Sequence, residues 1–267
     1  MKKYWSFFRI RFLNGLQYRA AAYAGIATQF FWGVMLILMY RAFYLANPEA
    51  FPMTLQQNST YIWLQQAFLT IFMTTGLDNE LFDLIISGNI AYEMIRPMNL
   101  YNMWMIKQMA NRMSKAILRC IPILLFSMLL PKPYGLALPA DLTSFAMFLI
   151  TMVLGFLTML AFQMLSYILV FYTMSSAGIR LIMIMVTEFL TGAYVPYPFL
   201  PEKLQAFLNL TPFAAMQNLP LRVYSGNIAG SELMIQFQLQ IFWLTALVLI
   251  GKLWLNHTLR RVVVQGG

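Results

Sequence analysis

Long apolar runs, separated by shorter polar or proline-containing connections, dominate this chain of 267 residues. Residues 142–174 contain no Asp, Glu, Lys or Arg, and about 20 apolar residues are enough for a helix to cross the hydrocarbon core of a bilayer. Only 10% of the residues are charged and 60% are hydrophobic, whereas a soluble domain has about 25% charged residues. We therefore predict an all-α integral membrane protein.

Six of the apolar runs are predicted to be transmembrane helices, within one transmembrane domain that comprises residues 1–267. The predicted spans are residues 20–40, 60–76, 116–130, 142–174, 179–194 and 233–255. The fourth run is longer than a bilayer requires, so that helix should tilt or extend beyond the membrane.

The N-terminal segment, residues 1–19, has the pattern of an amphipathic helix. Trp5, Phe8, Phe12 and Leu16 recur at helical spacing, and polar residues occupy the opposite face. A basic amphipathic helix of this kind lies in the interface between lipid and water. We expect an interfacial helix there.

Two long connections join the predicted spans. The first, residues 77–115, contains both acidic and basic residues and is expected to lie outside the membrane. In the second, residues 199–231, a short interfacial or re-entrant helix is predicted over residues 202–210, and Thr211-Pro212 would end it.

The Lys and Arg residues indicate the orientation of the chain. If the N-terminus is cytoplasmic and the six spans alternate, 14 of the 18 Lys and Arg residues lie inside. The four outside are Arg41, Lys132, Lys203 and Arg222. This asymmetry follows the positive-inside rule, so both termini are predicted to be cytoplasmic, in a bacterial inner membrane or a plasma membrane. The net charge of +9 then points to anionic lipid rather than to nucleic acid.

Motifs for catalysis or nucleotide binding are missing from the sequence. It contains no G-x-x-x-x-G-K-[ST] phosphate loop, no H-E-x-x-H and no G-x-S-x-G. Cys120 is the single cysteine and His257 the single histidine, which excludes an internal disulfide and disfavours a metal site. We expect no catalytic residue, metal or cofactor in this chain.

The first long connection contains Ser-Gly-Asn-Ile-Ala-Tyr-Glu-Met-Ile-Arg-Pro at positions 87–97. Glu93 and Arg96 are one helical turn apart and can pair, and Pro97 tends to end a helix at the preceding residue. A short, rigid, charged element outside the membrane suits docking against another protein. The alternative is a solvated loop that only connects two spans.

This segment resembles the permease subunits of type-2 ABC exporters, which carry a gly-x-ile/leu-x-tyr…arg-pro segment in that place. The end of the fifth predicted span and the second long connection are also similar to the family's region between spans five and six. Its shared features are, in order, Gly192-Ala193-Tyr194-Val195-Pro196, Leu200-Pro201, Thr211-Pro212-Phe213, Leu219-Pro220 and Gly226. With the basic N-terminal helix, the resemblance covers nearly the whole chain.

The resemblance implies a permease subunit that works with separate ABC ATPase subunits, which bind the ATP. It implies a second permease as well, either an identical copy or a similar chain, with the substrate path between the two. The family's cytoplasmic connection carries a coupling helix that sits on the ATPase. The coupling residues are therefore expected to be Gly88, Tyr92, Glu93, Arg96 and Pro97.

Glu188 is an ionisable residue inside the fifth predicted span. A charge near the middle of a bilayer costs roughly 2.5–3.5 kcal/mol on insertion scales, so we expect Glu188 to face the protein interior, a partner subunit or the translocation path. A purely structural Glu188, protonated or paired, is the alternative. Two other functions stay open at this point: an ion-coupled secondary transporter that protonates Glu188, and a membrane-embedded enzyme, which the residues favour least.

Overall fold

The computed structural model describes residues 2–17 and 19–261, and all regular structure in this part of the chain is helical. The helices are α1 (Lys2–Gly15), α2 (Arg19–Ala46), α3 (Leu55–Ala67), α4 (Leu69–Phe72), η1 (Thr74–Gly76), α5 (Asn79–Ile86), α6 (Ile90–Met94), α7 (Leu100–Leu129), α8 (Leu142–Thr173), α9 (Ser176–Leu190), η2 (Tyr197–Phe199), α10 (Glu202–Asn209), η3 (Ala214–Asn218), α11 (Leu219–Tyr224) and α12 (Gly230–Leu259). The prediction of an all-α protein is confirmed for these residues.

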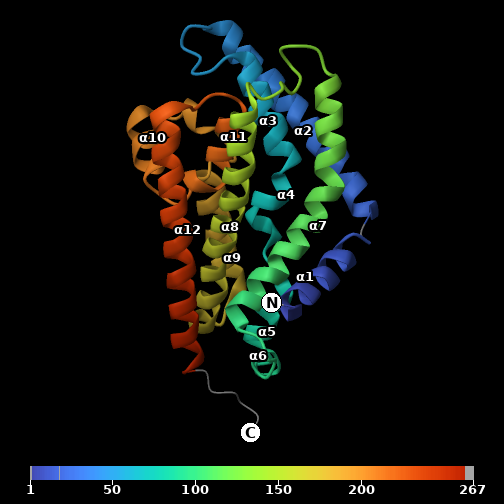
Figure 1. Cartoon of the computed structure of the whole chain (residues 1–267), viewed down its shortest axis with the longest axis vertical. Coiled ribbons are helices and arrows are strands. Elements are labelled where there is room, and N and C mark those ends of the chain that lie inside the picture. Colours follow the sequence, from blue (N-terminus) through green and yellow to red (C-terminus); the bar gives the residue numbers. More distant parts are fainter. Residues whose placement is uncertain (1, 18, 262–267) are drawn as a thin grey trace.

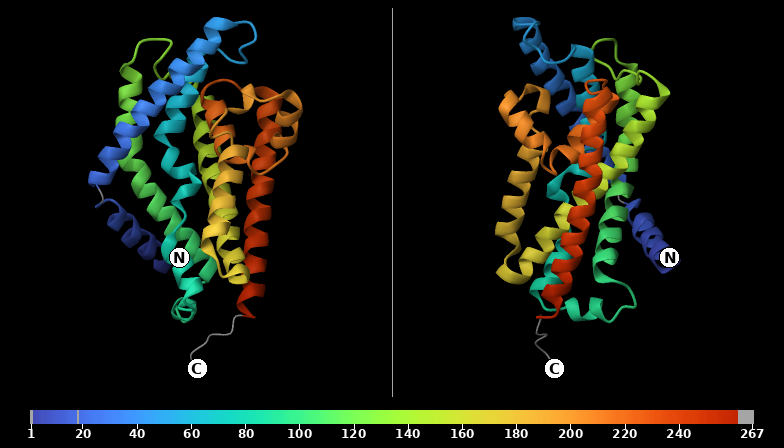
Figure 2. Two further views of the ribbon diagram at one scale, coloured as in Figure 1. Left: turned by 180° about the vertical axis from the view of Figure 1, so that it is seen from behind. Right: turned by 60° about the vertical axis from the view of Figure 1, so that its left-hand side comes forward.

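The long helices run side by side along one bundle (Figures 1 and 2). The beginning of α1 and the end of α12 lie at the same end of the bundle, together with α5 and α6. We call this the lower end, as it is drawn in Figure 1. The loops that follow α2 and α7 lie at the opposite, upper end.

Three helices in the described part of the chain are long and apolar enough to cross a membrane: residues Ala22–Ala46 of α2, and the whole of α8 and α12. They account for the first, fourth and sixth predicted spans. The remaining predicted spans correspond to helices that are broken, partly polar or short, so the structure shows three candidate spans and not six.

The third predicted span, residues 116–130, is the second half of a much longer helix. α7 has 30 residues, which corresponds to a length of about 45 Å. It begins at Leu100 because the side chain of Asn99 accepts a hydrogen bond from the backbone N–H of Asn102 and caps the helix. Residues 100–115 of the predicted extramembrane connection therefore belong to α7, and Lys107, Arg112 and Lys115 lie along this helix.

The second predicted span, residues 60–76, is interrupted. α3 starts at Leu55, where Thr54 and Gln57 form a capping box. The helix breaks at Phe68 and again at Met73, where the backbone is extended. This segment packs against α2, α7 and α8, and the side chains of α3 are mostly buried inside the protein.

The fifth predicted span, residues 179–194, ends earlier in the structure because α9 stops at Leu190. Gly192 has a φ of +78°, which favours glycine and turns the chain. The hydroxyl of buried Tyr197 donates to the carbonyl of Leu190, and Gln65 of α3 donates to the carbonyl of Ala193 at 2.6 Å. These contacts hold the end of α9.

A helix over residues 202–210 was predicted, and α10 lies there. The residues that enter the bundle, however, are those of η3 and α11, which are all buried and pack against α8. Gly155 of α8 lies so close to the carbonyl of Met216 that a side chain there would collide with it. Gln240 of α12 donates to the carbonyls of Thr151, at 2.9 Å, and Ala215, at 2.7 Å. The upper halves of α8 and α12 and η3 are therefore in close contact.

Candidate functional site

The segment from Asp78 to Asn99 forms the lower tip of the bundle (Figure 1). Asp78 caps α5, since its side chain accepts a hydrogen bond from the backbone N–H of Glu80 at 3.0 Å. Gly88, with a φ of +75°, follows α5 and lets the chain turn directly into α6. The result is a compact pair of short helices below the long ones.

The five residues expected to couple to an ATPase all lie in this tip. Glu93 and Arg96 form the ion pair that their spacing predicts, with 3.1 Å between Oε1 and Nη2. The carbonyl of Pro97 accepts a hydrogen bond from Lys3 of α1. Gly88 forms the turn between α5 and α6, and the side chain of Tyr92 on α6 is exposed. A coupling role for these five residues is proposed below.

An exposed apolar surface covers the outer side of α6. Tyr92 is 70% exposed and Ile95 is 81% exposed, and Met94 between them is exposed as well. We call these three residues the α6 patch. Exposed apolar residues that cluster outside the long helices are a common mark of a protein–protein contact.

The opposite side of the tip is buried in a hydrophobic cluster, the lower core. Its members are Leu77, Leu81, Phe82, Ile85, Ile90, Leu100, Tyr101, Met103, Trp104, Met164, Tyr167, Ile168, Val170 and Leu255. The rings of Phe82 and Tyr167 lie 4.7 Å apart, and the guanidinium of Arg180 at the start of α9 lies over the Phe82 ring. Packing thus joins the tip to α7, α8, α9 and α12. Burial of each such side chain stabilises the folded protein by about 1.5–3 kcal/mol.

A charge cluster joins the tip to α7. The ammonium of Lys107, whose side chain is only 4% exposed, lies 3.1 Å from Asp78 Oδ2 and 2.7 Å from Glu80 Oε2. Arg11 of α1 reaches the same Glu80 carboxylate at 3.7 Å. A buried lysine needs such partners, since an unpaired buried charge is costly.

Asp78, the N-cap of α5, also contacts α8. The backbone N–H of Asp78 donates to the hydroxyl of Tyr167 at 2.7 Å, and this hydroxyl donates to Gln108 Oε1 at 3.4 Å. α1, α5, α7 and α8 therefore share one polar network. A displacement of α5 would break it or move all four helices.

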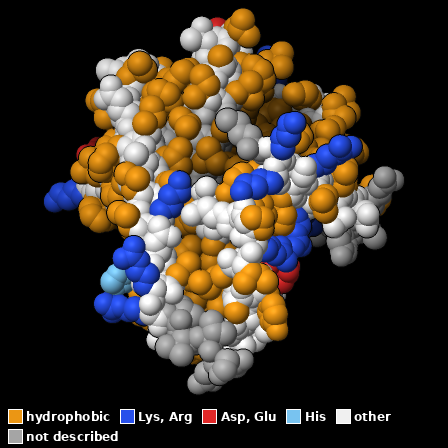
Figure 3. All heavy atoms as spheres, turned by 60° about the horizontal axis from the view of Figure 1, so that its bottom comes forward, with side chains coloured by type: hydrophobic (Ala, Val, Ile, Leu, Met, Phe, Trp, Pro, Cys, Tyr) orange, Lys and Arg blue, Asp and Glu red, His pale blue; other side chains and the backbone are white. Residues whose placement is uncertain are grey.

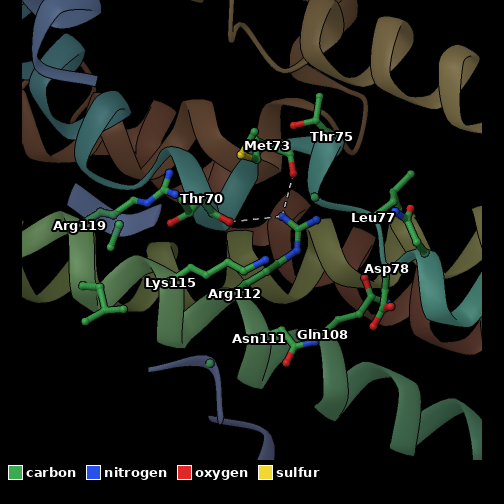
Figure 4. Close-up of a pocket in the computed structure, with 15 residues that line it drawn as sticks. Thr70, Met73, Thr75, Leu77, Asp78, Gln108, Asn111, Arg112, Lys115 and Arg119 are labelled. Carbon is green, nitrogen blue, oxygen red and sulfur yellow. Dashed lines mark hydrogen bonds between the residues drawn. The ribbon is translucent and has the colours of Figure 1, made fainter. Parts of the chain in front are cut away.

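Arg112 of α7 lies deeper and binds the break that follows α3 (Figure 4). Its side chain is buried, with 4% exposed. Nη1 donates to the carbonyls of Ile71, at 2.9 Å, and Met73, at 2.8 Å, and Nη2 donates to Gln163 Oε1 at 2.8 Å. Carbonyls left without a helical partner need another donor inside a membrane protein, and Arg112 supplies it.

Glu188 is not part of this site. It lies two residues before the end of α9, half-buried, and accepts a hydrogen bond from the hydroxyl of Tyr194 at 3.0 Å. α9 rises from the lower end (Figure 1), so Glu188 lies in the upper half of this helix.

Sequence reasoning counted Asp78, Glu80, Lys107 and Arg112 only as charges of a connection. Two local signals could have corrected this: Asn99 as a helix cap before a long amphipathic run, and Asp78 as the cap of α5. The contacts of Lys107 and Arg112 themselves join distant parts of the chain, and no local pattern announces them.

Basic side chains spread over the lower face of the molecule, with few acidic ones among them (Figure 3). Among residues 2–17 and 19–261 there is no cluster of three or more His, Cys, Asp or Glu residues that could hold a metal ion. The site is thus one of ion pairs, packing and an exposed apolar patch.

A family model described as ABC-2 family transporter protein matches residues 22–266. A comparison with curated proteins gives no match. The match covers most of the chain and includes the tip, the long apolar helices and the buried η3–α11 segment. The chain therefore belongs to the ABC-2 transporter family, as a membrane component that serves transport and is not an enzyme.

Proposed function

We propose that this chain is the permease subunit of an ATP-driven exporter, with the lower end of the bundle in the cytoplasm. Separate ATPase subunits bind ATP and dock against the tip, and a second permease completes the substrate path. α2, α3–η1, α7, α8, α9 and α12 are the six membrane-crossing segments in this proposal. The broken α3–η1 segment is accommodated because protein, not lipid, surrounds it.

The α6 patch carries the proposal. It combines an exposed apolar surface with a rigid base in the lower core, and it lies on a five-residue helix too short to cross a membrane. Docking on this patch would bury Tyr92 and Ile95, while the network around Lys107 would transmit a displacement of α5 to α7 and α8. The basic lower face supports the cytoplasmic assignment under the positive-inside rule.

Glu188 supports a protein-lined environment for the upper half of α9. Leu181, Ile182, Met185 and Phe189 on this helix are exposed in the single chain, and Glu188 lies among them with one hydrogen-bond partner. A carboxylate on a lipid-facing helix is costly. A second permease packed along α9 would cover it and would bring two copies of Glu188 to the path between the subunits.

The docking proposal is tested with the double substitution Tyr92→Ala and Ile95→Ala. Loss of two exposed apolar side chains at the centre of an interface should weaken ATPase binding by about tenfold or more, because such anchors contribute on the order of 1–2 kcal/mol each. The measurement is the amount of polypeptide labelled by azido-ATP that co-purifies with the permease in mild detergent.

Leu253→Ala is the matched control, because Leu253 is equally exposed but lies on the side of α12, among residues assigned to the membrane. It should leave co-purification unchanged. Equal recovery of the ATP-binding polypeptide with the double variant and with wild type would remove the α6 patch from the docking interface.

Glu188→Gln should leave expression and assembly nearly intact and reduce export, because the amide preserves the volume and removes the charge. Growth of cells that depend on this permease is the readout, with Glu202→Gln on exposed α10 as the control. Normal export by Glu188→Leu would show that the charge is dispensable. Export that persists without ATP and collapses with the proton gradient would support the ion-coupled transporter instead.

A further inference from the structure

A cavity of about 620 Å³ lies where the end of α1, at Gly15, and the beginning of α2, at Ala22, meet α7 and the segment from Thr70 to Asn79. Figure 4 shows Arg112, Lys115 and Arg119 of α7 lining it. These residues are spaced three and four apart, so they share one face of the helix. Neither the docking tip nor Glu188 accounts for this cavity.

The charge of the cavity is strongly positive. Asp78 is the acidic residue in its lining, and the carboxylate of Asp78 is already paired with Lys107. Arg112 is held by backbone carbonyls, but the ammonium of Lys115 has no ion pair or hydrogen bond with any other described residue. This ammonium is available to an anion, while Arg112 and Arg119 add positive charge to the lining and Thr75 and Asn111 add polar side chains.

Two glycines, Gly15 and Gly25, allow α1 and α2 to pack closely against α7 beside the cavity. A side chain at Gly25 of α2 would collide with the guanidinium of Arg119, and one at Gly15 of α1 would collide with Ser114. The two helices that flank the cavity can therefore approach α7 closely without displacing its cations.

The surroundings of the cavity are apolar. Tyr23 of α2, next to Ala22 of the lining, is exposed. On the other side lies α1, whose Trp5 and Ile10 are exposed, as expected of a helix in the membrane interface. An anionic head group in the cavity would therefore have exposed apolar side chains of α1 and α2 beside it.

We propose that this cavity binds the phosphate group of an anionic phospholipid from the leaflet at the lower end. The head group would contact Lys115 and Arg119, and the acyl chains would lie against the exposed apolar side chains of α1 and α2. None of the residues that line the cavity belongs to the α6 patch.

The test is native mass spectrometry of the purified permease after exchange into micelles that contain phosphatidylglycerol or phosphatidylcholine. Wild type should retain phosphatidylglycerol in preference. The double substitution Lys115→Gln and Arg119→Gln should weaken retention by about tenfold or more, because each basic residue near an anionic head group contributes about fivefold. The control is Lys132→Gln with Lys203→Gln, which removes two exposed cations from the upper end.

Added glycerol phosphate and inorganic phosphate distinguish a lipid from a soluble anion. Neither should displace phosphatidylglycerol at millimolar concentration if the acyl chains contribute to binding, and displacement would assign the cavity to a soluble phosphate. Lys115→Gln alone serves as a second variant, since its side chain is exposed and the change cannot leave a buried vacancy. Equal retention of both lipids by wild type, or unchanged retention by both variants, overturns the proposal.

Discussion

Arg112→Met is expected to lower the free energy of unfolding by about 3 kcal/mol or more, since hydrogen bonds to a charged group contribute about 1.5–3 kcal/mol each. The substitution leaves the carbonyls of Ile71 and Met73 and the side chain of Gln163 without their donor. Arg112 is only 4% exposed, so few water molecules can take its place. Thermal unfolding of the purified permease in detergent measures the loss.

Arg112→Lys should fall between wild type and Arg112→Met, because one ammonium cannot reach all three acceptors in the way that the planar guanidinium does. Lys203→Met removes an exposed cation from α10 and should change stability by less than about 0.5 kcal/mol. An Arg112→Met protein as stable as wild type would mean that the break after α3 needs no donor from α7.

Lys107→Met is expected to destabilise the tip by about 2 kcal/mol. It leaves Asp78 and Glu80 without their shared cation, and two carboxylates that lie close together then repel each other. The value is set below that of a fully buried pair because Glu80 is partly exposed and solvent screens it. Hydrogen exchange at the backbone amides of α5 should become faster, with little change in the upper half of α12.

The same cluster sets a pH dependence. Partial burial alone would raise the pKa of Glu80, but the hydrogen bond and charge of Lys107, helped by Arg11 and Arg96, outweigh it and lower that pKa from its ordinary 4.5. A carboxyl whose pKa is lower in the folded state stabilises above its unfolded pKa, and this contribution is lost as the pH falls through the folded pKa. In Lys107→Met this loss of α5 protection at low pH should become smaller, because the remaining cations lower the pKa of Glu80 less and protonation relieves its repulsion with Asp78.

Arg11→Gln is the control for Lys107, since it removes a longer and more exposed contact to the same carboxylate. It should change the exchange of α5 only slightly. If Lys107→Met and Arg11→Gln increased the exchange of α5 equally, the burial of Lys107 would not contribute to the stability of the tip.

Composition and hydrophobic runs were sufficient to predict the long apolar helices. α8 and α12 contain long stretches of apolar residues, and no tertiary contact is needed to infer a helix from them. The turns and the ion pair of the tip were also predictable, because Gly88 and Pro97 mark its turns by their backbone preferences and Glu93–Arg96 is a local pair. In both cases the prediction needed only residues that are close together in the sequence.

Segments that protein surrounds were harder to predict. In α7 the basic residues Lys107 and Arg112 resemble those of an exposed connection, and only their partners in α5 and in the break after α3 make burial tolerable. α3 has a similar difficulty, since its many polar residues argue against a span until its neighbours are known. Sequence hydropathy identifies helices in apolar surroundings such as α8, but it does not show which polar or charged side chains find partners inside the bundle.

The region between α9 and α12 was difficult to predict for a further reason. Pro212 and Pro220 interrupt every simple periodicity there, and the prediction assigned the insertion to residues 202–210. In the structure the π-helical residues of η3 reach the bundle because Gly155 leaves space for the Met216 carbonyl. That fit depends on a residue about 60 positions away, beyond any local window.

α8 extends as one uninterrupted helix along the bundle. Tyr167 contacts the cap of α5, and Gly155 touches η3, 12 residues or about 18 Å further along the axis. No loop or break interrupts α8 between these two residues. The cap of α5 at the lower end and the buried segment η3 in the upper half of the bundle therefore contact the same continuous helix.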